Sequence, residues 1–283
     1  MSKQELFRRM RLSGFFMIGI TLVVLLIVIA LLGPFIAPHD PAQPHLMLRL
    51  QPPDLSRGWS EFPLGNDALG RCVLSRLLIG STVSFQVAGT VVALTFLIGT
   101  MLGVVAGFFG GVVDTVIMRL GDIQLSIPQL IFAIAIMAVL GNSMFNLIVV
   151  LVINGWVQFA RLVRSSVMMI RNNEFVHASK ALGSSNIRIM FTQILPNVMT
   201  SLIIVTSQDF GRIILTEATL SFIGLGVPPP APSWGSMIAA GREYLSTSPF
   251  VVLAPGMALM VVVFAFNFMG NGLRDVLDPK NKK

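Results

Sequence analysis

The sequence predicts an all-α, polytopic membrane protein with six transmembrane helices and with both termini in the cytoplasm. Its composition is the first reason: 54% of the 283 residues are hydrophobic and 12% are charged, against roughly 25% charged residues in soluble domains. The second reason is a series of apolar runs, each close to the ~20 residues that a helix needs to cross a bilayer. Because lipid offers no partner to backbone polar groups, runs of this length form helices.

The apolar runs define six spans, at residues 14–37, 83–109, 123–140, 144–160, 198–227 and 250–269. The first run is longer than the roughly 7–15 apolar residues of a signal peptide, so we expect a retained helix. Pro128 is expected to bend the third span. Gly99, Gly103 and Gly107 recur every four residues, which predicts a face where another helix packs closely.

Basic residues set the predicted orientation. With the N-terminus in the cytoplasm, most of the 20 basic residues fall in cytoplasmic segments: Lys3, Arg8, Arg9, Arg11, Arg119, Arg161, Arg164, Arg171, Lys180, Arg188, Arg274, Lys280, Lys282 and Lys283. The outer segments hold Arg49, Arg57, Arg71, Arg76 and Arg242, balanced by Asp40, Asp54, Glu61, Asp67 and Glu243. This asymmetry follows the positive-inside rule. It accounts for the pI near 10.5 without nucleic acid as a partner.

The chain is thereby divided into five parts. We expect a cytoplasmic tail (1–13), the first transmembrane helix (14–37), an extracytoplasmic loop (38–82), a transmembrane core (83–270) and a second cytoplasmic tail (271–283). Within the core, the longest cytoplasmic connection is expected at about 161–197.

Several kinds of chemistry are disfavoured by what the sequence lacks. Cys72 is the single cysteine, so no intrachain disulfide is possible, and we expect it to be structural. His39, His45 and His177 are scattered, so no metal or cofactor site is expected. There is no Gly-x-x-x-x-Gly-Lys-[Ser/Thr] loop to bind ATP, and no clustered acid/base set that would indicate an enzyme.

The most informative segment is residues 174–197, which we call the elbow. Asn172 or Asn173 can cap a first helix, Glu174 suits the positive end of its dipole, and Gly183 can end it. A second helix is expected after Ser184, Ser185 or Asn186, with Pro196 at the transition into the fifth span. Apolar side chains follow helical spacing on both helices: Phe175, Ala178 and Leu182, then Ile187, Met190, Phe191, Ile194 and Leu195. These features fit either a docking surface for a soluble partner or a helix lying on lipid headgroups.

The elbow resembles the "EAA" loop of bacterial ABC importer permeases, which has Glu-Ala-Ala, a glycine four residues later, and a hydrophobic residue two positions before Leu-Pro. Here the corresponding residues are His177-Ala178-Ser179, Gly183, Gln193 and Leu195-Pro196. The glycine and Leu-Pro spacing fits. His177, Ser179 and Gln193 depart from the pattern. The resemblance implies that the elbow contacts an ATPase subunit through Glu174, Phe175, His177, Ala178, Ser179, Lys180, Leu182 and Gly183.

Other motifs extend the resemblance over nearly the whole chain. They are Leu64 to Arg71, Gly107 to Gly111, Ser221 to Val227, Ser233-Trp234-Gly235 and Gly272 to Pro279. Together they resemble the second permease, or C-type, subunit of the dipeptide, oligopeptide and nickel importers. This branch also includes importers of glutathione, and the sequence leaves the substrate open.

The resemblance implies a type I ABC importer in the bacterial inner membrane. Two homologous permeases would form the pore, two cytoplasmic ATPase subunits would bind ATP and magnesium, and an extracytoplasmic binding protein would deliver a peptide. The loop at 38–82 would face the binding protein. From the residues alone, an ion-driven secondary transporter or a channel, working without ATPase partners, remains an alternative.

The fifth span carries four polar residues in an apolar setting, Gln208, Asp209, Arg212 and Glu217. Such groups usually face a bundle interior or water. Asp209 and Arg212 are three residues apart and can form an ion pair on one helix face. We expect this pair to be structural, at the contact between two permeases; a patch that meets the charged ends of a peptide is the alternative. Glu217 is expected to be the better pore candidate.

Overall fold

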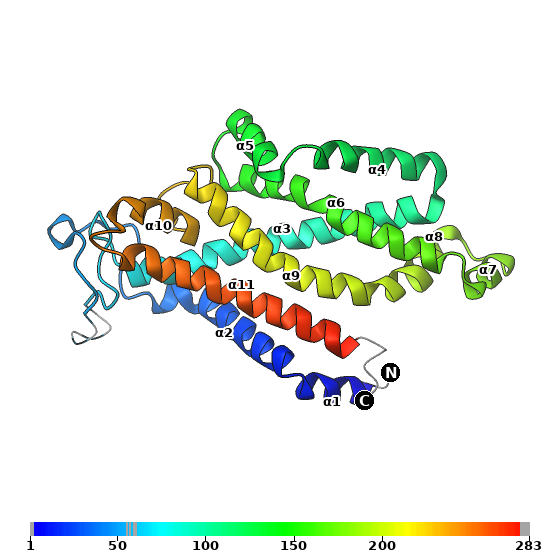
Figure 1. Cartoon of the computed structure of the whole chain (residues 1–283), viewed down its shortest axis with the longest axis horizontal. Helices are drawn as coiled ribbons and strands as arrows, with labels where there is room; N and C mark the ends of the chain where they lie inside the picture. The colour runs from blue at the N-terminus through cyan, green and yellow to red at the C-terminus, as the bar shows by residue number, and fades with distance from the viewer. Residues whose placement is uncertain (1–2, 55, 57, 59–60, 278–283) are drawn as a thin grey trace.

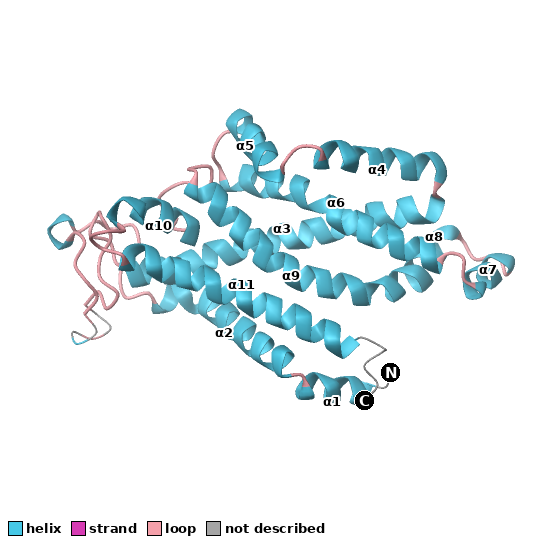
Figure 2. Cartoon of the chain, viewed as in Figure 1, coloured by secondary structure: helices cyan, strands magenta, loops and turns pink. Residues whose placement is uncertain are grey.

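The computed structural model describes residues 3–54, 56, 58 and 61–277, with side chains from residue 8. The predicted positions Arg57, Lys280, Lys282 and Lys283 lie outside this part of the chain, as do the last two residues of the motif ending at Pro279. All the named elements are helical (Figure 2). They are α1 (Lys3–Leu12), α2 (Gly14–Ile36), η1 (Leu46–Leu48), α3 (Val73–Phe109), α4 (Gly111–Leu125), α5 (Gln129–Leu140), α6 (Met144–Ile170), α7 (Glu174–Ala181), α8 (Asn186–Ile189), η3 (Met190–Ile194), α9 (Leu195–Phe222), α10 (Trp234–Gly241), η4 (Arg242–Tyr244) and α11 (Phe250–Leu277).

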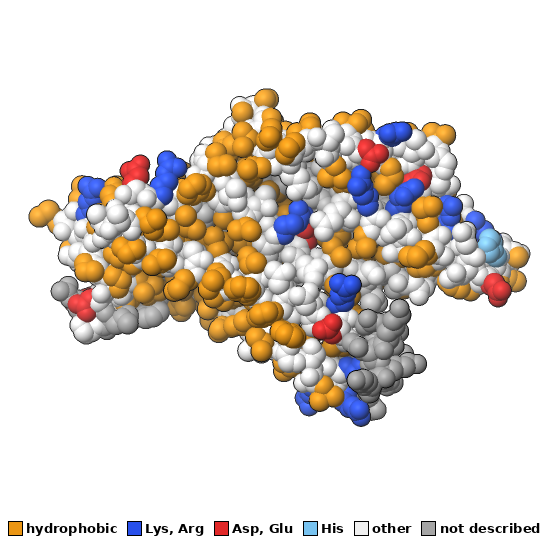
Figure 3. Space-filling view, in the orientation of Figure 1, with side chains coloured by type: hydrophobic (Ala, Val, Ile, Leu, Met, Phe, Trp, Pro, Cys, Tyr) orange, Lys and Arg blue, Asp and Glu red, His pale blue; other side chains and the backbone are white. Residues whose placement is uncertain are grey.

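The helices form an elongated bundle (Figure 1). Helix α3 packs along α6, α2 packs along α11, and α9 lies against both α3 and α11. Helices α1 and α7 and the last turn of α11 lie toward one end of the bundle, whereas α10 and residues 38–72, which we call the long loop, lie at the other (Figure 1). On the visible face, most basic side chains lie in the half of the molecule that carries α1, α4 and α7, and a smaller number lie at the opposite end (Figure 3).

Within the described residues, five helices are long and apolar enough to cross a membrane, and the number of spans is six if the bent pair α4 and α5 counts as one span. The bend predicted at Pro128 is present, since the chain turns by 88° between α4 and α5, but the third span at 123–140 is two helices and not one. Pro128 lacks an N–H and disfavours a helical residue before it, so one helix ends before it and another begins after it. Helix α4 also begins well before the predicted span, at Gly111.

Other boundaries differ from the predictions because polar residues continue the helices. Helix α3 begins at Val73, so residues 73–82 belong to it and not to the predicted loop; its buried Ser75 and Arg76 had lowered the local hydropathy. Helix α6 runs to Ile170 and therefore includes Arg161 and Arg164, which were assigned to a loop. Helix α11 likewise continues to Leu277, beyond the predicted end at 269.

The glycine face predicted on the second span is the contact between α3 and α6. A Cβ atom added to Gly103 would lie 2.6 Å from the carbonyl oxygen of Ala160. At Gly99 it would lie 2.5 Å from Cβ of Phe159, and at Gly107 2.8 Å from Cβ of Val167. Any larger residue would push the two helices apart, so the close-packing prediction is confirmed.

The long loop is fixed by a buried charge cluster at the start of α3. Asp67 accepts a 2.8 Å hydrogen bond from Nε of Arg71 and lies 3.5 Å from Nε of Arg76. Arg76 also donates to the carbonyl oxygen of Pro41 at 2.9 Å. Cys72 is buried and unpaired at the N-cap of α3. The loop is therefore packed by its own residues onto the helices.

Candidate functional site

The elbow forms a helix, a glycine turn and a second helix, as predicted. Helix α7 begins at Glu174, and Gly183 adopts a left-handed φ of +79° after it. The hydroxyl oxygen of Ser185 accepts from the backbone N–H of Arg188 and caps α8. Asn173 occupies the N-cap position of α7, but its side chain makes no capping hydrogen bond there.

The transition into the fifth span differs from the prediction. Residues from Asn186 to Phe222 form one continuous helical run, with Pro196 inside it. A π-helical segment at Met190–Ile194 precedes the proline, and the N–H of Leu195 bonds to the carbonyl oxygen of Met190. This shift of register accommodates Pro196, which has no N–H and whose ring crowds the preceding turn.

The apolar side chains of the elbow divide between an anchor and an open surface. Val176, Ile189 and Ile194 are buried and pack in a cluster with residues of α3 and α6. By contrast, Leu182 is 87% exposed and Ile187 is 66% exposed. The open surface further includes Phe175, Phe191, His177 and Ala178. One face of the elbow is therefore anchored in the bundle, and the other is exposed.

Two of the three departures from the EAA pattern meet in the structure. Nε2 of Gln193, in the π segment, donates a 2.5 Å hydrogen bond to Oγ of Ser179 on α7. Both positions are apolar in the pattern, and here one polar contact joins them. The third departure, His177, is exposed on α7.

Basic residues in the elbow and just before it contact the end of α3. Nη1 of Arg171 donates a 2.8 Å hydrogen bond to the carbonyl oxygen of Gly107 at the end of α3. The ammonium of Lys180 lies 5.1 Å from the ring centroid of Phe108. Both contacts place positive charge at the C-terminal end of α3, where the helix dipole favours it.

Two further arginines join α6 to α4. The guanidinium of Arg164 binds both carboxylate oxygens of Asp114, with Nη2 2.6 Å from Oδ2. Arg161 Nη2 lies 2.6 Å from Oδ1 of Asp122. These arginines, expected to set orientation from a loop, therefore also fasten two helices together.

The predicted ion pair on the fifth span is present on α9. Nε of Arg212 donates a 2.7 Å hydrogen bond to Oδ1 of Asp209, and Nη1 lies 3.4 Å from Oε1 of Gln129 on α5. The side chain of Asp209 is fully buried, whereas that of Arg212 is 35% exposed. Gln208 donates to Oδ1 of Asn271 on α11 at 2.9 Å.

Glu217 lies elsewhere. It is fully buried and accepts a 2.7 Å hydrogen bond from the hydroxyl of Ser221. That hydroxyl lies 3.3 Å from Oγ of Ser233, which caps α10. Glu217 therefore belongs to the junction that folds α10 back against α9, and a solute cannot touch it. The predicted preference for Glu217 over Asp209 and Arg212 as a pore residue finds no support in this placement.

A cavity of about 450 Å³ opens beside the ion pair, between α6, α9 and α11. It is lined by Gln158, Gln208, Asp209, Gly211, Arg212, Leu215, Val263 and Asn267. The sequence analysis missed Gln158 and Asn267 as candidates, although each is a carboxamide inside a long apolar helix. A polar carboxamide within an apolar run was the sequence feature that could have identified both residues.

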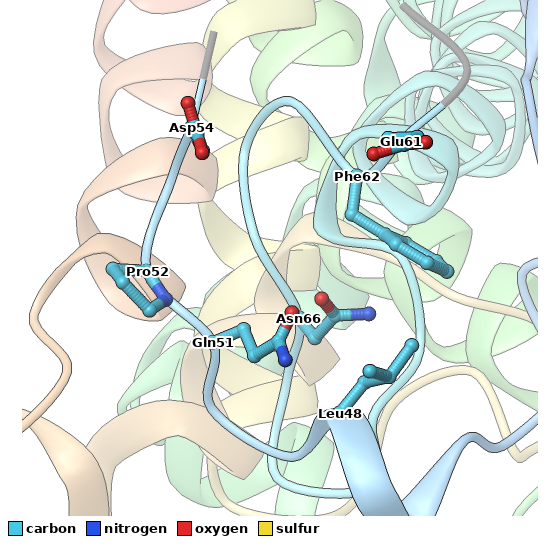
Figure 4. A pocket seen from close by; sticks show the side chains of 7 residues that line it. All are labelled: Leu48, Gln51, Pro52, Asp54, Glu61, Phe62 and Asn66. Carbon is cyan, nitrogen blue, oxygen red and sulfur yellow. The ribbon is translucent and has the colours of Figure 1, made fainter. Parts of the chain in front are cut away.

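A second cavity, of about 510 Å³, lies in the long loop. Figure 4 shows Asn66 and Gln51 near its centre, with Asp54 and Glu61 farther out. Asn66 is buried and donates to the carbonyl oxygen of Gly70 at 2.9 Å. This cavity lies at the end of the bundle and is separate from the membrane-spanning helices.

Comparison with known proteins assigns this chain to a family. A family profile described as "Binding-protein-dependent transport system inner membrane component" matches residues 99–283, and one described as "N-terminal TM domain of oligopeptide transport permease C" matches residues 3–53. The chain belongs to this family of inner-membrane transport components. It is therefore a multi-pass, non-catalytic permease subunit of a bacterial ABC importer, and the ion-driven alternative is set aside.

Individual relatives cover nearly the whole chain. The di/tripeptide transport system permease protein DppC of Pseudomonas aeruginosa is 40% identical over 93% of this chain and 88% of its own length. The oligopeptide transport system permease protein OppC of Bacillus subtilis is 36% identical over 97% of this chain and 88% of its own length. A structure of the MetNI methionine ABC transporter matches with a TM-score of 0.58 at 19% identity, over 72% of this chain and 97% of the matched chain. The last match supports the fold alone.

Proposed function

We propose that this permease forms half of the passage through which an ATP-driven importer moves dipeptides or oligopeptides inward. Its relatives named for di/tripeptide and oligopeptide transport support the cargo class. A second, homologous permease would complete the passage, and an extracytoplasmic binding protein would deliver the peptide to the end that carries the long loop. Lipid would surround the exposed apolar faces of the spans.

The elbow is the proposed contact with one of two cytoplasmic ATPase subunits, which would hold ATP and magnesium. The observation that carries this assignment is its open apolar surface, above all Leu182 at 87% exposure, on a segment whose other side is anchored in the bundle. A water-exposed apolar patch of this kind is typical of a surface that another protein covers. Movement of the partner would reach α3, α4 and α6 through Arg171, Arg164 and the buried anchor. Both termini lie on the same, cytoplasmic side in this proposal.

The proposal is tested by purifying the tagged chain from its native membranes in mild detergent. We expect a second permease and ATPase subunits to co-purify, and we expect the complex in proteoliposomes to take up a radiolabelled dipeptide when ATP and the loaded binding protein are supplied. Replacing Leu182 by Asp should release the ATPase subunits and leave the two permeases together. A complex that keeps its ATPase subunits after this change would argue against the elbow as their contact.

A further inference from the structure

The polar cavity between α6, α9 and α11 differs in chemistry from the rest of the membrane-spanning surface. It carries the Arg212–Asp209 pair and the carboxamides of Gln158, Gln208 and Asn267 on three different helices. On the visible face, a small group of basic and acidic side chains interrupts the apolar surface midway along the bundle (Figure 3). Burying polar groups among apolar helices is costly, so their convergence on one cavity requires an explanation.

The geometry of the ion pair does not fit a purely structural role. Asp209 is sealed beneath the helix surface, but Arg212 keeps about a third of its side chain open to the cavity. Among the described residues, Oδ2 of Asp209 has no hydrogen-bond partner. A buried ion pair stabilises a protein only when its remaining donors and acceptors are satisfied. The cavity therefore meets the guanidinium of Arg212, whose charge is neutralised by the buried Asp209 on the side away from the cavity.

The carboxamides extend the same surface. The amide of Asn267 donates to the carbonyl oxygen of Val263 on its own helix, which leaves its oxygen for another donor. Gln158 is exposed at the cavity. Carboxamides both donate and accept hydrogen bonds, as peptide groups do. A volume of about 450 Å³ lies within the roughly 300–1,000 Å³ range of sites for small ligands.

We propose that this cavity is a transient binding site for the peptide in transit, in which Arg212 contacts its terminal carboxylate and the carboxamides contact its backbone. The inference rests on the proposed peptide passage and adds a recognition step inside the membrane. Because Asp209 neutralises Arg212, the site attracts a carboxylate without holding it as strongly as an unpaired arginine would. Weak binding of this kind is what a passage needs, since cargo must leave as well as enter.

The test measures access to the cavity by thiol labelling. Leu215 lines the cavity and is 51% exposed, so Leu215→Cys introduces a reactive thiol there, and the buried Cys72 contributes little background. The purified complex is labelled with a small maleimide, with and without millimolar alanyl-alanine or its C-terminal amide. We expect alanyl-alanine at about twice its Kd to slow labelling about threefold, and the amide to slow it much less, because only the free acid offers a carboxylate to Arg212.

The double variant Asp209→Asn/Arg212→Gln removes both charges and avoids leaving either one buried alone. In this background the two peptides should protect the thiol equally. The matched control is Asp122→Asn/Arg161→Gln, which removes an ion pair outside the cavity and should leave the discrimination intact. Arg212→Lys, which keeps the charge and loses the planar fork, should show intermediate discrimination.

The inference is overturned if the free acid and the amide protect the thiol equally in the Leu215→Cys protein that keeps Asp209 and Arg212. It is also overturned if acetate protects the thiol as well as alanyl-alanine does. It is also overturned if the double variant separates the two permeases on size exclusion, because the pair would then be a subunit contact. Failure of the proposed function has a different signature, namely no ATP-dependent dipeptide uptake by the unmodified complex. Labelling does not depend on uptake, so the two failures are distinguishable.

Discussion

The long loop (residues 38–72) and the elbow (residues 174–197) connect helices at opposite ends of the molecule (Figure 1). Backbone hydrogen bonds cross the long loop, from Leu50 to Asp67 at 3.1 Å and from Asn66 to Gln51 at 3.1 Å. Its Asp67 is paired with Arg71 and lies against Arg76 of α3, which is 6% exposed. In the elbow, Val176 and Ile189 are buried, whereas Leu182 is 87% exposed and Ile187 is 66% exposed.

This difference separates two roles for irregular connections in a membrane protein. The long loop stabilises the fold with its own contacts, so changes there should lower stability. The elbow leaves apolar surface for another protein, so changes there should affect communication and have little effect on stability. The predictions below test this separation, beginning with the largest expected effect.

Asp67→Asn should cause the largest loss of stability. It leaves Arg71 and the buried Arg76 without their shared carboxylate. Removing one partner of a buried ion pair costs about 3 kcal/mol or more. Thermal unfolding in detergent measures the loss. The matched control is Asp40→Asn, an exposed acid of the same loop that accepts from the N–H of Ala42; it should cost about 1 kcal/mol or less. Equal losses would contradict the buried cluster.

Gly183→Val should uncouple ATP hydrolysis from uptake. Gly183 has a φ of +79° with open space around it, and a β-branched residue there costs roughly 1–2 kcal/mol. Relief of this strain would change the turn and misplace α7. If a strain of ~1.4 kcal/mol disfavours the docked position of α7, that position is populated about tenfold less, and uptake per ATP should fall about tenfold. Gly224 is the control, because it has a φ of +90°, equally open surroundings, and a position on the α9–α10 connection.

Gly224→Val should impose similar strain and leave the ratio of uptake to ATP hydrolysis unchanged. If both variants lower this ratio alike, general strain explains the result and the elbow has no special role in coupling. Membrane insertion of both variants, followed by fractionation, should equal that of the unmodified chain.

The contact between Ser179 and Gln193 should have a smaller effect. Ser179→Ala removes one hydrogen bond, worth about 1 kcal/mol, so amides of α7 should exchange with deuterium roughly fivefold faster. The double variant Ser179→Ala/Gln193→Leu restores the apolar pair of the EAA pattern and should recover protection. Faster exchange in the double variant than in the single one would show that the two residues are not coupled.

The sequence was sufficient for the spans and the elbow because both depend on local patterns. Apolar length located the helices, and the glycine followed by a serine cap located the elbow turn. The bend at Pro128 was predicted, but its size of 88° and the interruption of the helix were not, because a proline in an apolar run is compatible with either a bend or a break. Packing against other helices also bears on the choice, and it is not visible in local spacing; Nη1 of Arg212 on α9, for example, donates to Oε1 of Gln129 at the start of α5.

The polar residues of α9 show more clearly what local sequence patterns cannot predict. Spacing correctly predicted the pair of Asp209 and Arg212, since it lies within one helix turn. Spacing carried no information on which face meets a cavity, and Glu217 was therefore preferred over Arg212 as the pore candidate. Their difference arises from α10, which folds over Glu217, and from α6 and α11, which leave space beside Arg212.

The last and smallest effect concerns pH and the long loop. The ring of His39 stacks on Phe62 with a centroid distance of 4.1 Å. Burial, together with the nearby charge of His45, lowers the pKa of His39 below its ordinary value of 6.5. At pH values above about 6.5 the residue is neutral whether the loop is folded or not, so it makes no difference to stability. As the pH falls below that value, the unfolded loop takes up a proton that the folded loop resists, and the folded loop loses stability.

Protection of the long loop from deuterium exchange should therefore decrease between pH 7 and pH 5 while the elbow, measured in the same experiment, serves as the internal reference. His39→Phe keeps a ring against Phe62 and has no proton to gain, so its loop should lose less protection on acidification. If the acid-induced loss is the same in both proteins, other groups in the loop cause it. If the elbow loses more protection on acidification than the long loop does, the long loop is not the more pH-sensitive of the two connections.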